Sequence, residues 1–213
     1  MEIPIYSNIR ENLELIETFM WDPEKGAPDI ALHLERMCKS AANLKFKFEI
    51  NKIKEKIVKI KSQSRLRCRL TLRFDGKINL TTATLTPNSK NWILGLSETI
   101  LNSSDPWLLH KSSNRALYDA ERAKLPDGID EFIYLNERNE VCEGTITNIF
   151  VKKAGQWLTP PLSSGCLPGV LRRKKIEDGS CKVKIITFSD LHDAEKIIVG
   201  NALRGEIEAV LSH

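Results

Sequence analysis

The chain has 213 residues, enough to bury one substantial hydrophobic core or two small ones. Its composition, 41% hydrophobic and 28% charged, is ordinary for a globular protein, and no apolar run reaches the ~18 residues that a membrane helix needs. The five cysteines are scattered and no secretory leader is visible, so we expect a reducing, cytoplasmic location without disulfides or a zinc site.

The net charge of +4 is unevenly distributed along the chain. Residues 45–69 carry a local excess of eight positive charges, and the remainder carries a net −4. A basic block can bind nucleic acid. However, Ile53, Ile57 and Ile60 recur at helical spacing between the lysines, and over residues 50–69 no aromatic residue interleaves with the basic residues to stack on bases. We therefore predict an amphipathic helix with a solvated face, and expect neither a nucleic-acid nor a membrane partner.

The first part of the chain predicts a small α+β domain, residues 1–95. Residues 13–21 read as a strand, and Asp29 is placed to cap a helix. The predicted apolar face of that helix comprises Ile30, Leu34, Met37, Cys38 and Ala41. Residues 65–74 alternate apolar side chains with Arg or Thr, and Asp75-Gly76 turns this strand into a second one at 77–86. The polar face of the hairpin is either solvent-exposed or lines an anionic cleft.

The second part, residues 96–213, alternates strands and helices. Loop signals at 87–89 and 102–106 enclose a short strand at 92–96. Further strands are predicted at 107–110, 130–135, 148–159 (a hairpin), 183–188 and 196–199, with a tight turn at 200–205. Ser112 or Ser113 is placed to cap a helix that runs to residue 124. The pattern as a whole predicts an α+β protein.

Residues 141–150 read as two β segments separated by a polar knot. The knot contains Glu143, Gly144, two threonines and Asn148. An acid is costly to bury unless a positive group meets it, and glycine lets the backbone approach a ligand closely. Taken by itself, the stretch is also explained by an ordinary hairpin. With Lys111 upstream and a glycine-bearing loop at 167–172 downstream, we favour a ligand site.

Five landmarks occur in order: HLERM at 33–37, HKSSNR at 110–115, EGTITN at 143–148, LPGVLR at 167–172 and GNALRG at 200–205. With these the chain resembles the class IV aminotransferases, the fold-type IV enzymes of pyridoxal 5′-phosphate (PLP). The resemblance runs from about residue 13 to 210. It implies a two-domain α+β fold of the D-amino acid aminotransferase type, with the cofactor between the domains and its lysine in the larger, C-terminal one.

The resemblance also implies a role for each landmark. Lys111 would hold PLP by an imine and act as the catalytic base, and Glu143 would keep the pyridine nitrogen protonated. The implied cofactor-binding residues are Arg36, Lys111, Glu143, Thr147, Asn148, Val170, Leu171 and Asn201, with Arg36, Asn201 and the helix start at Val170 on the phosphate. Thr147 and Asn148 are either cofactor contacts or turn groups. Arg69, Ala202 and Leu203 are candidates for binding a substrate carboxylate.

Among class IV enzymes, the residues around Lys111, 158–161 and 201–205 most resemble the lyase-type domain fused to aminodeoxychorismate synthase. This implies a homodimeric 4-amino-4-deoxychorismate lyase that gives 4-aminobenzoate, a folate precursor, and pyruvate, with that synthase as functional partner. A class IV aminotransferase of branched-chain or D-amino acids is the alternative, and a non-catalytic scaffold is a further one. The chain lacks the longer members' Asp-x-Gly opening and is short after Arg172, and both departures touch parts that shape the substrate pocket.

Overall fold

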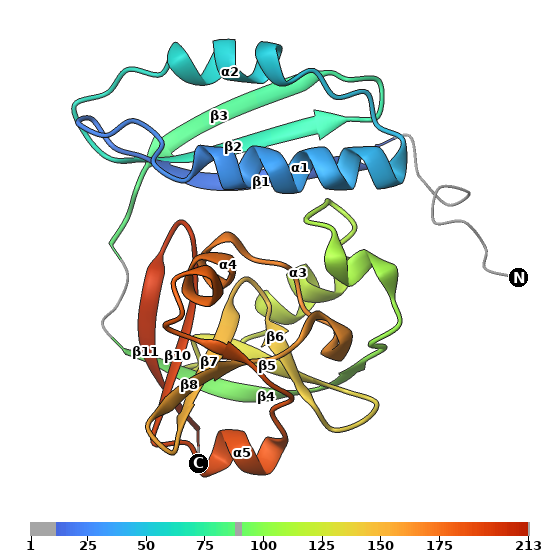
Figure 1. The fold of residues 1–213 in the computed structure, drawn as a ribbon, viewed down its shortest axis with the longest axis vertical. Helices are drawn as coiled ribbons and strands as arrows, with labels where there is room; N and C mark the ends of the chain where they lie inside the picture. The colour runs from blue at the N-terminus through green and yellow to red at the C-terminus, as the bar shows by residue number, and fades with distance from the viewer. Residues whose placement is uncertain (1–11, 88–90, 213) are drawn as a thin grey trace, which may run out of the picture. The chain divides into compact units, whose positions relative to one another are not determined.

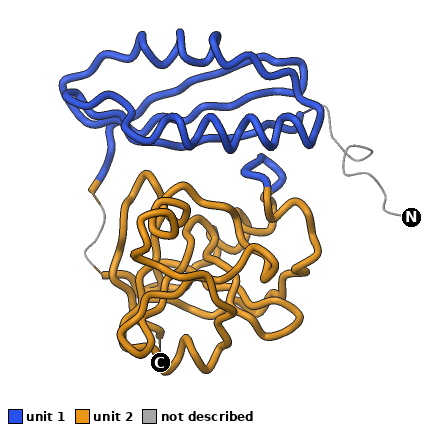
Figure 2. Tube along the Cα trace, in the orientation of Figure 1, with its two compact units in different colours: residues 1–86, 110–114 blue, residues 87–109, 115–213 orange. Residues whose placement is uncertain are grey.

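The computed structural model describes residues 12–87 and 91–212, and it divides the chain into two compact units (Figures 1 and 2). Unit 1 consists of residues 1–86 and 110–114, and unit 2 of residues 87–109 and 115–213. The first division between the units falls after residue 86, whereas the boundary predicted from the sequence lies at residue 95. Lys111 groups with unit 1 and not with the C-terminal unit, because residues 110–114 pair with the first strand. Residues 88 and 89, part of the predicted boundary, lie outside the described residues.

The described part of unit 1 is a three-stranded antiparallel sheet, in the order β1-β2-β3, with two helices packed on it. The strands are β1 (Glu14–Trp21), β2 (Leu66–Arg73) and β3 (Ile78–Thr84). The helices are α1 (Ile30–Leu44), which packs on β1, and α2 (Ile50–Val58), which packs on β3.

The alternation predicted for residues 65–74 is confirmed in part: Cys68, Leu70 and Leu72 are fully buried and Arg67 is exposed. It fails at Thr71, which is buried, and at Phe74, which is exposed. Two details of α1 differ from the prediction. Asp29 stands at its N-cap, but the side chain makes no capping hydrogen bond. Cys38 is exposed and does not belong to the buried face, which is instead formed by His33, Leu34, Met37, Ser40, Ala41 and Leu44.

Unit 2 is built on a mixed sheet of eight described strands, in the order β6-β5-β4-β11-β10-β7-β8-β9. These are β4 (Asn91–Leu101), β5 (Glu131–Asn136), β6 (Val141–Gly144), β7 (Asn148–Lys153), β8 (Gln156–Thr159), β9 (Lys182–Val183), β10 (Lys196–Asn201) and β11 (Gly205–Leu211). β4 runs parallel to β5 and β11, and β8 runs parallel to β9. A turn from Gly144 to Thr147, closed by the Gly144 N–H and the Thr147 carbonyl (2.8 Å), brings the edge strand β6 beside β7.

The helices of unit 2 are α3 (Ala116–Arg122), α4 (Val170–Glu177) and α5 (Phe188–His192). The strand predicted at 107–110 is wrong, because Pro106–Leu109 forms a 3-10 helix. The strand predicted at 183–188 is largely wrong as well: Thr187 and Asp190 form a capping box that starts α5 at Phe188. The predicted caps of α3 also fail, and Arg115 occupies its N-cap position.

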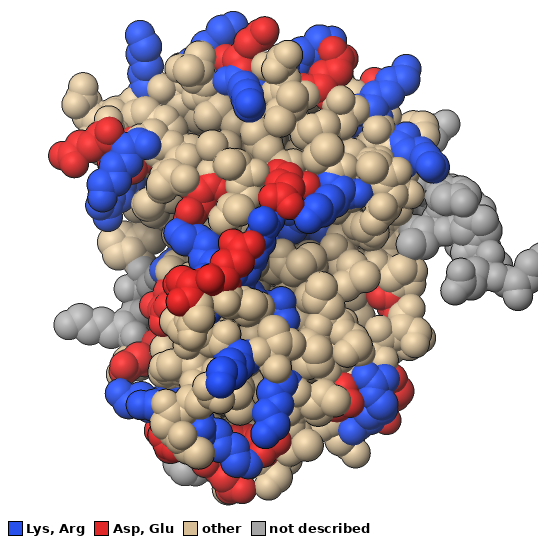
Figure 3. Space-filling model, in the orientation of Figure 1, with Lys and Arg blue, Asp and Glu red and all other residues tan. Residues whose placement is uncertain are grey.

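None of the helices in the described residues is both long and apolar enough to cross a membrane. On the face shown in Figure 3, Lys and Arg side chains over unit 1 are interspersed with Asp and Glu. Two ion pairs in unit 1 join Lys52 to Glu49 (2.7 Å) and Lys39 to Glu35 (2.7 Å).

Candidate active site

Lys111 lies in an extended segment, residues 110–114, that adds to the free edge of β1. The Ile16 N–H donates to the Lys111 carbonyl (2.8 Å), and the Ser113 N–H donates to the Glu14 carbonyl (2.8 Å). The Glu14 N–H in turn donates to the Ser113 hydroxyl (2.9 Å). Because hydrogen bonds to a strand tie both the lysine and its neighbour, the backbone that carries the amine is held in place.

The neighbours of Lys111 have structural partners of their own. Ser112 faces Leu15 in an antiparallel bridge, which explains why it does not cap α3. The His110 Nδ1 lies 2.9 Å from the Ser40 hydroxyl on α1. Burial lowers the pKa of His110, so its imidazole is neutral at neutral pH. The structure therefore gives the His110 side chain a polar contact with α1.

Arg36, on α1, forms a two-point ion pair with Glu17 on β1. Its Nε donates to Oε1 (2.9 Å) and its Nη2 donates to Oε2 (2.5 Å). Burial opposes ionisation of Glu17, but Arg36 and His33 outweigh it and lower the pKa of the carboxyl to about 2. Sequence reasoning missed Glu17. Its signal was an acid within the mostly apolar stretch 15–21, but the pattern did not reveal its partner.

Glu143 lies in β6, one residue before its end, and donors fix both oxygens of its carboxylate. The Tyr118 hydroxyl donates to Oε1 (3.0 Å), and the Leu167 N–H donates to Oε2 (2.9 Å). Glu143 is only 7% exposed. Burial and the adjacent Glu143 carboxylate raise the pKa of Tyr118 above its usual range, so the phenol stays a donor. Tyr118 comes from α3, and no sequence pattern indicated its role beyond its place after Lys111.

A fully buried acid, Glu131 on β5, shapes the turn that follows Glu143. Its carboxylate accepts the Thr145 N–H (3.0 Å), the Thr145 hydroxyl (2.5 Å) and the Thr147 hydroxyl (3.1 Å), and Arg122 contacts it at 3.3 Å. Gly144 is required here, because a Cβ at this position would overlap Thr147 and Glu131. The two threonines of the polar knot are thus turn-forming groups in the structure.

Asn148 connects the same turn to the start of α4. Its Nδ2 donates to the Leu167 carbonyl (3.0 Å), and its side chain fills the space that a Cβ on Gly169 would need. Gly169 occupies the N-cap of α4 and supplies no side chain to accept from the first helical N–H groups, which include those of Val170 and Leu171. An N-terminus without a side-chain cap suits an anion.

Asn201 organises the turn between β10 and β11. Its Nδ2 donates to the Ile146 carbonyl (3.0 Å), and its Oδ1 accepts the N–H groups of Leu203 (3.0 Å) and Arg204 (2.9 Å). The Leu203 amide, a predicted carboxylate ligand, is therefore engaged within the turn, and the side chain predicted to bind phosphate has turn-forming contacts. Ala202 lies in the same turn.

The predicted residues are distributed over both units. Arg36, Arg69 and Lys111 belong to unit 1, and Glu143, Thr147, Asn148, Val170, Leu171, Asn201, Ala202 and Leu203 belong to unit 2. Within unit 2 the structure joins the turn after Glu143 to α4 through Asn148 and to the β10–β11 turn through Asn201. Arg69 lies on β2 between Thr18 and Thr81 and is partly exposed.

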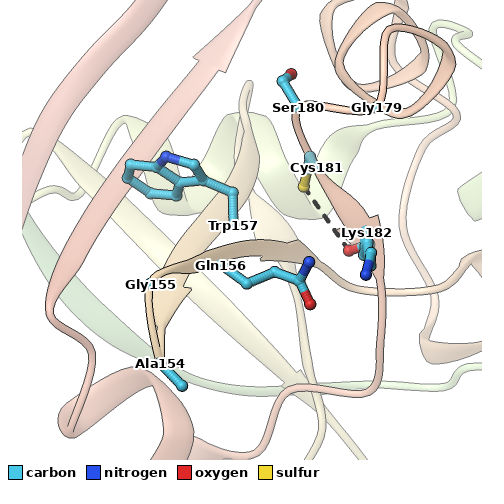
Figure 4. Close-up of a pocket in the computed structure, with 8 residues that line it drawn as sticks. All are labelled: Ala154, Gly155, Gln156, Trp157, Gly179, Ser180, Cys181 and Lys182. Carbon is cyan, nitrogen blue, oxygen red and sulfur yellow. Dashed lines mark hydrogen bonds between the residues drawn. The ribbon is translucent and has the colours of Figure 1, made fainter.

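A shallow hollow of ≈ 350 Å³ in unit 2 contains none of the predicted residues (Figure 4). It is lined by residues 154–157 of the β7–β8 hairpin and residues 179–182. Burial raises the pKa of its Cys181 to about 11, which keeps the sulfur as an unreactive thiol. This hollow is therefore not the candidate active site.

Comparison with known proteins identifies the class. The model of the family described as amino-transferase class IV matches residues 14–210, nearly the whole chain. The chain therefore belongs to the class IV aminotransferase family, whose members depend on PLP. The solved structure of a Mesorhizobium loti protein, provisionally named an amino-acid aminotransferase, is 38% identical with a TM-score of 0.90, and the match covers 94% of this chain and 100% of that one.

Two further relatives carry different names. A Schizosaccharomyces pombe protein, provisionally named an aminodeoxychorismate lyase, is 26% identical over 94% of this chain and 90% of its own length. The PLP-bound form of a hypothetical aminotransferase from Mycobacterium tuberculosis has a TM-score of 0.80 at 16% identity, covering 93% of this chain and 81% of that chain. The last likeness shows the fold alone. Together these matches confirm the predicted α+β, fold-type IV architecture.

Proposed function

We propose that the chain is a PLP-dependent 4-amino-4-deoxychorismate lyase. The observation that carries the cofactor part is the tethering of Lys111 to β1 within a chain whose family depends on PLP. The lyase part is supported by the S. pombe relative, which is similar over 94% of this chain and is provisionally named for this reaction. The residues around Lys111 and in the turn 201–205 favour the same reaction.

The residues present fit the cofactor. Lys111 would hold its aldehyde carbon, and Glu143 would hold a proton at its pyridine nitrogen. The Glu143 carboxylate suits this, because Tyr118 and Leu167 already fix the direction of its oxygens. Arg36 and the N-terminus of α4, which has no side-chain cap, would take the phosphate. When bound, PLP supplies an electron sink for the carbon that bears the substrate amine.

Lys111 would then move one proton. Its amine would take the proton from the ring carbon that carries the substrate amine, and the bond from the ring to the enol-pyruvyl oxygen would break. Protonation of the methylene carbon of that leaving group completes pyruvate. The ring that remains is aromatic 4-aminobenzoate, so substrate and products balance without any oxidant or water, and aromatisation drives the step.

An aminotransferase is the second candidate, and the M. loti relative at 38% identity favours it. Both reactions use the same lysine and cofactor acid, and they differ in how the substrate is held. In a transaminase, Lys111 would likewise move one proton. Water would release the substrate as a keto acid, and its amino group would pass to 2-oxoglutarate to give glutamate. A non-catalytic scaffold is less favoured, because Lys111, Glu143 and Arg36 are all held by specific partners in the structure.

The deciding assay uses the PLP-loaded protein in two parallel reactions. One receives 4-amino-4-deoxychorismate, and the other receives branched-chain or D-amino acids with 2-oxoglutarate. We expect equal amounts of pyruvate and 4-aminobenzoate in the first reaction. Glutamate in the second reaction without products in the first would replace the lyase by the aminotransferase. Lys111→Ala should abolish either activity and serves as the control.

The cellular setting belongs to the same proposal. A cytoplasmic location fits the four buried cysteines, which are free thiols in the structure. Aminodeoxychorismate synthase would be the functional partner, because it makes the substrate of the proposed reaction.

A further inference from the structure

Glu17 is an acidic residue on β1, a strand that is otherwise mostly apolar, and only 1% of its surface is exposed to solvent. Both of its oxygens are engaged by side chains of α1. Oε1 accepts Arg36 Nε (2.9 Å), and Oε2 accepts Arg36 Nη2 (2.5 Å) and lies 2.6 Å from His33 Nδ1. The three residues all belong to unit 1, so this cluster is defined within one compact body.

Glu17 is ionised at neutral pH. Burial alone would favour the neutral acid, but the neighbouring Arg36 and His33 lower its pKa to about 2. His33 Nε2 is buried and has no partner in the described structure, so the tautomer that donates Nδ1–H to Glu17 avoids a buried, unsatisfied donor. The negative charge of Glu17 therefore directly offsets the positive charge of Arg36.

This neutralisation conflicts with a purely electrostatic role for Arg36. A cation that binds a phosphate through charge alone is weakened by a carboxylate in contact with it. A guanidinium carries five N–H groups, and the pair with Glu17 uses two of them along one edge. Such two-point contact fixes the guanidinium plane before a ligand arrives, which lowers the ordering entropy lost on binding.

We propose that Glu17 is a positioning residue that presets the Arg36 guanidinium for a phosphate group, so that removal of its negative charge weakens phosphate binding. The inference rests on the proposed function, in which Arg36 binds the cofactor phosphate. It goes further by assigning the orientation of Arg36 to an acid of the neighbouring strand. It also predicts that removing the Glu17 charge lowers the affinity for PLP, whereas an effect of charge alone would raise that affinity.

Two variants of Glu17 separate orientation from charge. Glu17→Gln keeps the size and removes the charge, whereas Glu17→Asp keeps the charge and withdraws the carboxylate by one methylene. If orientation dominates, both variants bind PLP more weakly, by about tenfold, because a charge-assisted hydrogen bond is lost. If charge dominates, Glu17→Gln binds more tightly and Glu17→Asp is unchanged.

The measurement is the dissociation constant of the cofactor-free protein for PLP and for pyridoxal, which lacks the phosphate. The ratio of the two constants isolates the contribution of the phosphate. We expect the Glu17 variants to lose affinity for PLP and to keep their affinity for pyridoxal. Glu35→Gln is the matched control, because it makes the same charge change on α1, the helix that carries Arg36, at a surface pair with Lys39. It should leave both constants unchanged.

A double-mutant cycle with Arg36→Lys completes the test. Since Glu17 acts through Arg36, Glu17→Gln should cost little further PLP affinity in the Arg36→Lys background. A folded Glu17 variant that binds PLP as tightly as the wild type, or full additivity in the cycle, overturns the inference. Far-UV circular dichroism establishes folding, and the charged Asp variant keeps the test open if the Gln variant does not fold. A wild-type protein that fails to bind PLP would instead overturn the proposed function itself.

Discussion

Three buried carboxylates have fixed hydrogen-bond partners among the residues of the candidate site. Glu17 holds Arg36, and Glu131 holds the turn that contains Thr145 and Thr147. Glu143 is itself held, by one donor from a helix and one from a loop. A buried acid is tolerated only when donors surround it, and each of these acids has at least two. The site residues are therefore placed by contacts that exist before any ligand binds.

Thr147 provides a test of the Glu131 cluster. Thr147→Val keeps the shape of the side chain and removes the hydroxyl that donates to the buried Glu131. We expect the free energy of unfolding to fall by about 1–2 kcal/mol, because a charged acceptor loses one of its donors. Thr84→Val, at an exposed position on β3, is the matched control and should change stability by less than about 0.5 kcal/mol. Equal effects of the two substitutions in urea unfolding would contradict this role.

The residues predicted from the landmarks were the ones whose chemistry is visible in the sequence alone. Lysine, arginine and an acid beside glycine are recognisable by type and order. Glu17, Glu131 and Tyr118 were missed because their importance comes from partners 14 to 25 residues away along the chain. A pattern of alternation assigns a face to such residues, but it does not specify which side chain lies opposite.

At the scale of elements, the sheet and the long helix of unit 1 were predictable and the short elements were not. The alternation in β2 and the helical spacing in α1 each extend over eight or more residues, so both patterns are strong. The 3-10 helix Pro106–Leu109 contains four residues and α5 contains five, too few for a period to show. Phe188 has an aromatic side chain, which favours strands, and the predicted strand therefore extends to it. The capping box of Thr187 and Asp190 overrides that preference and starts α5 at Phe188.

The β5–β6 connection predicts a pH dependence of stability. Hydrogen bonds from Arg138, Asn136 and Ser164 lower the pKa of Glu140 to about 2 from a usual 4.5, although burial opposes them. A carboxyl with a lowered folded-state pKa contributes stability above about pH 4.5, and this contribution is lost as the pH falls towards 2.

Glu140→Gln should therefore reduce the free energy of unfolding at pH 7 by about 1–2 kcal/mol. The expected loss is kept this small because Arg138 is partly exposed, and solvent screens its interaction with Glu140. The difference from the wild type should narrow as the pH is lowered from about 5 to about 3. Urea unfolding at several pH values measures it, with Glu208→Gln at an exposed position of β11 as control. A difference that stays constant over this range would rule out the proposed ion pair as its source.

At the scale of the whole molecule, the division into units was predictable only approximately. The loop residues predicted around 87–89 indicated where the chain first passes from unit 1 to unit 2. No feature of the composition indicated that residues 110–114 return to unit 1 and pair with β1. That return depends on backbone hydrogen bonds of Lys111 and Ser113, and backbone pairing between distant segments is not encoded by side-chain type alone. The substrate pocket was equally inaccessible, since the landmarks specify the cofactor and not the walls around it.

We also propose that the active form is a homodimer. The resemblance of the five landmarks to the class IV enzymes implies this assembly. Sedimentation velocity of the PLP-loaded protein should show a species of twice the chain mass of 24.2 kDa. Full activity in a species of one chain mass would disprove this assembly.

The most direct test of the account is to locate the bound cofactor. The protein is incubated with PLP, reduced with borohydride and digested, and the peptides are analysed by mass spectrometry. We predict a visible absorption band before reduction and a single pyridoxyl label on Lys111 after it, with Lys111→Ala unlabelled and the other lysines unmodified. A protein that stays colourless with PLP, or a label spread over surface lysines with none on Lys111, would contradict the central claim.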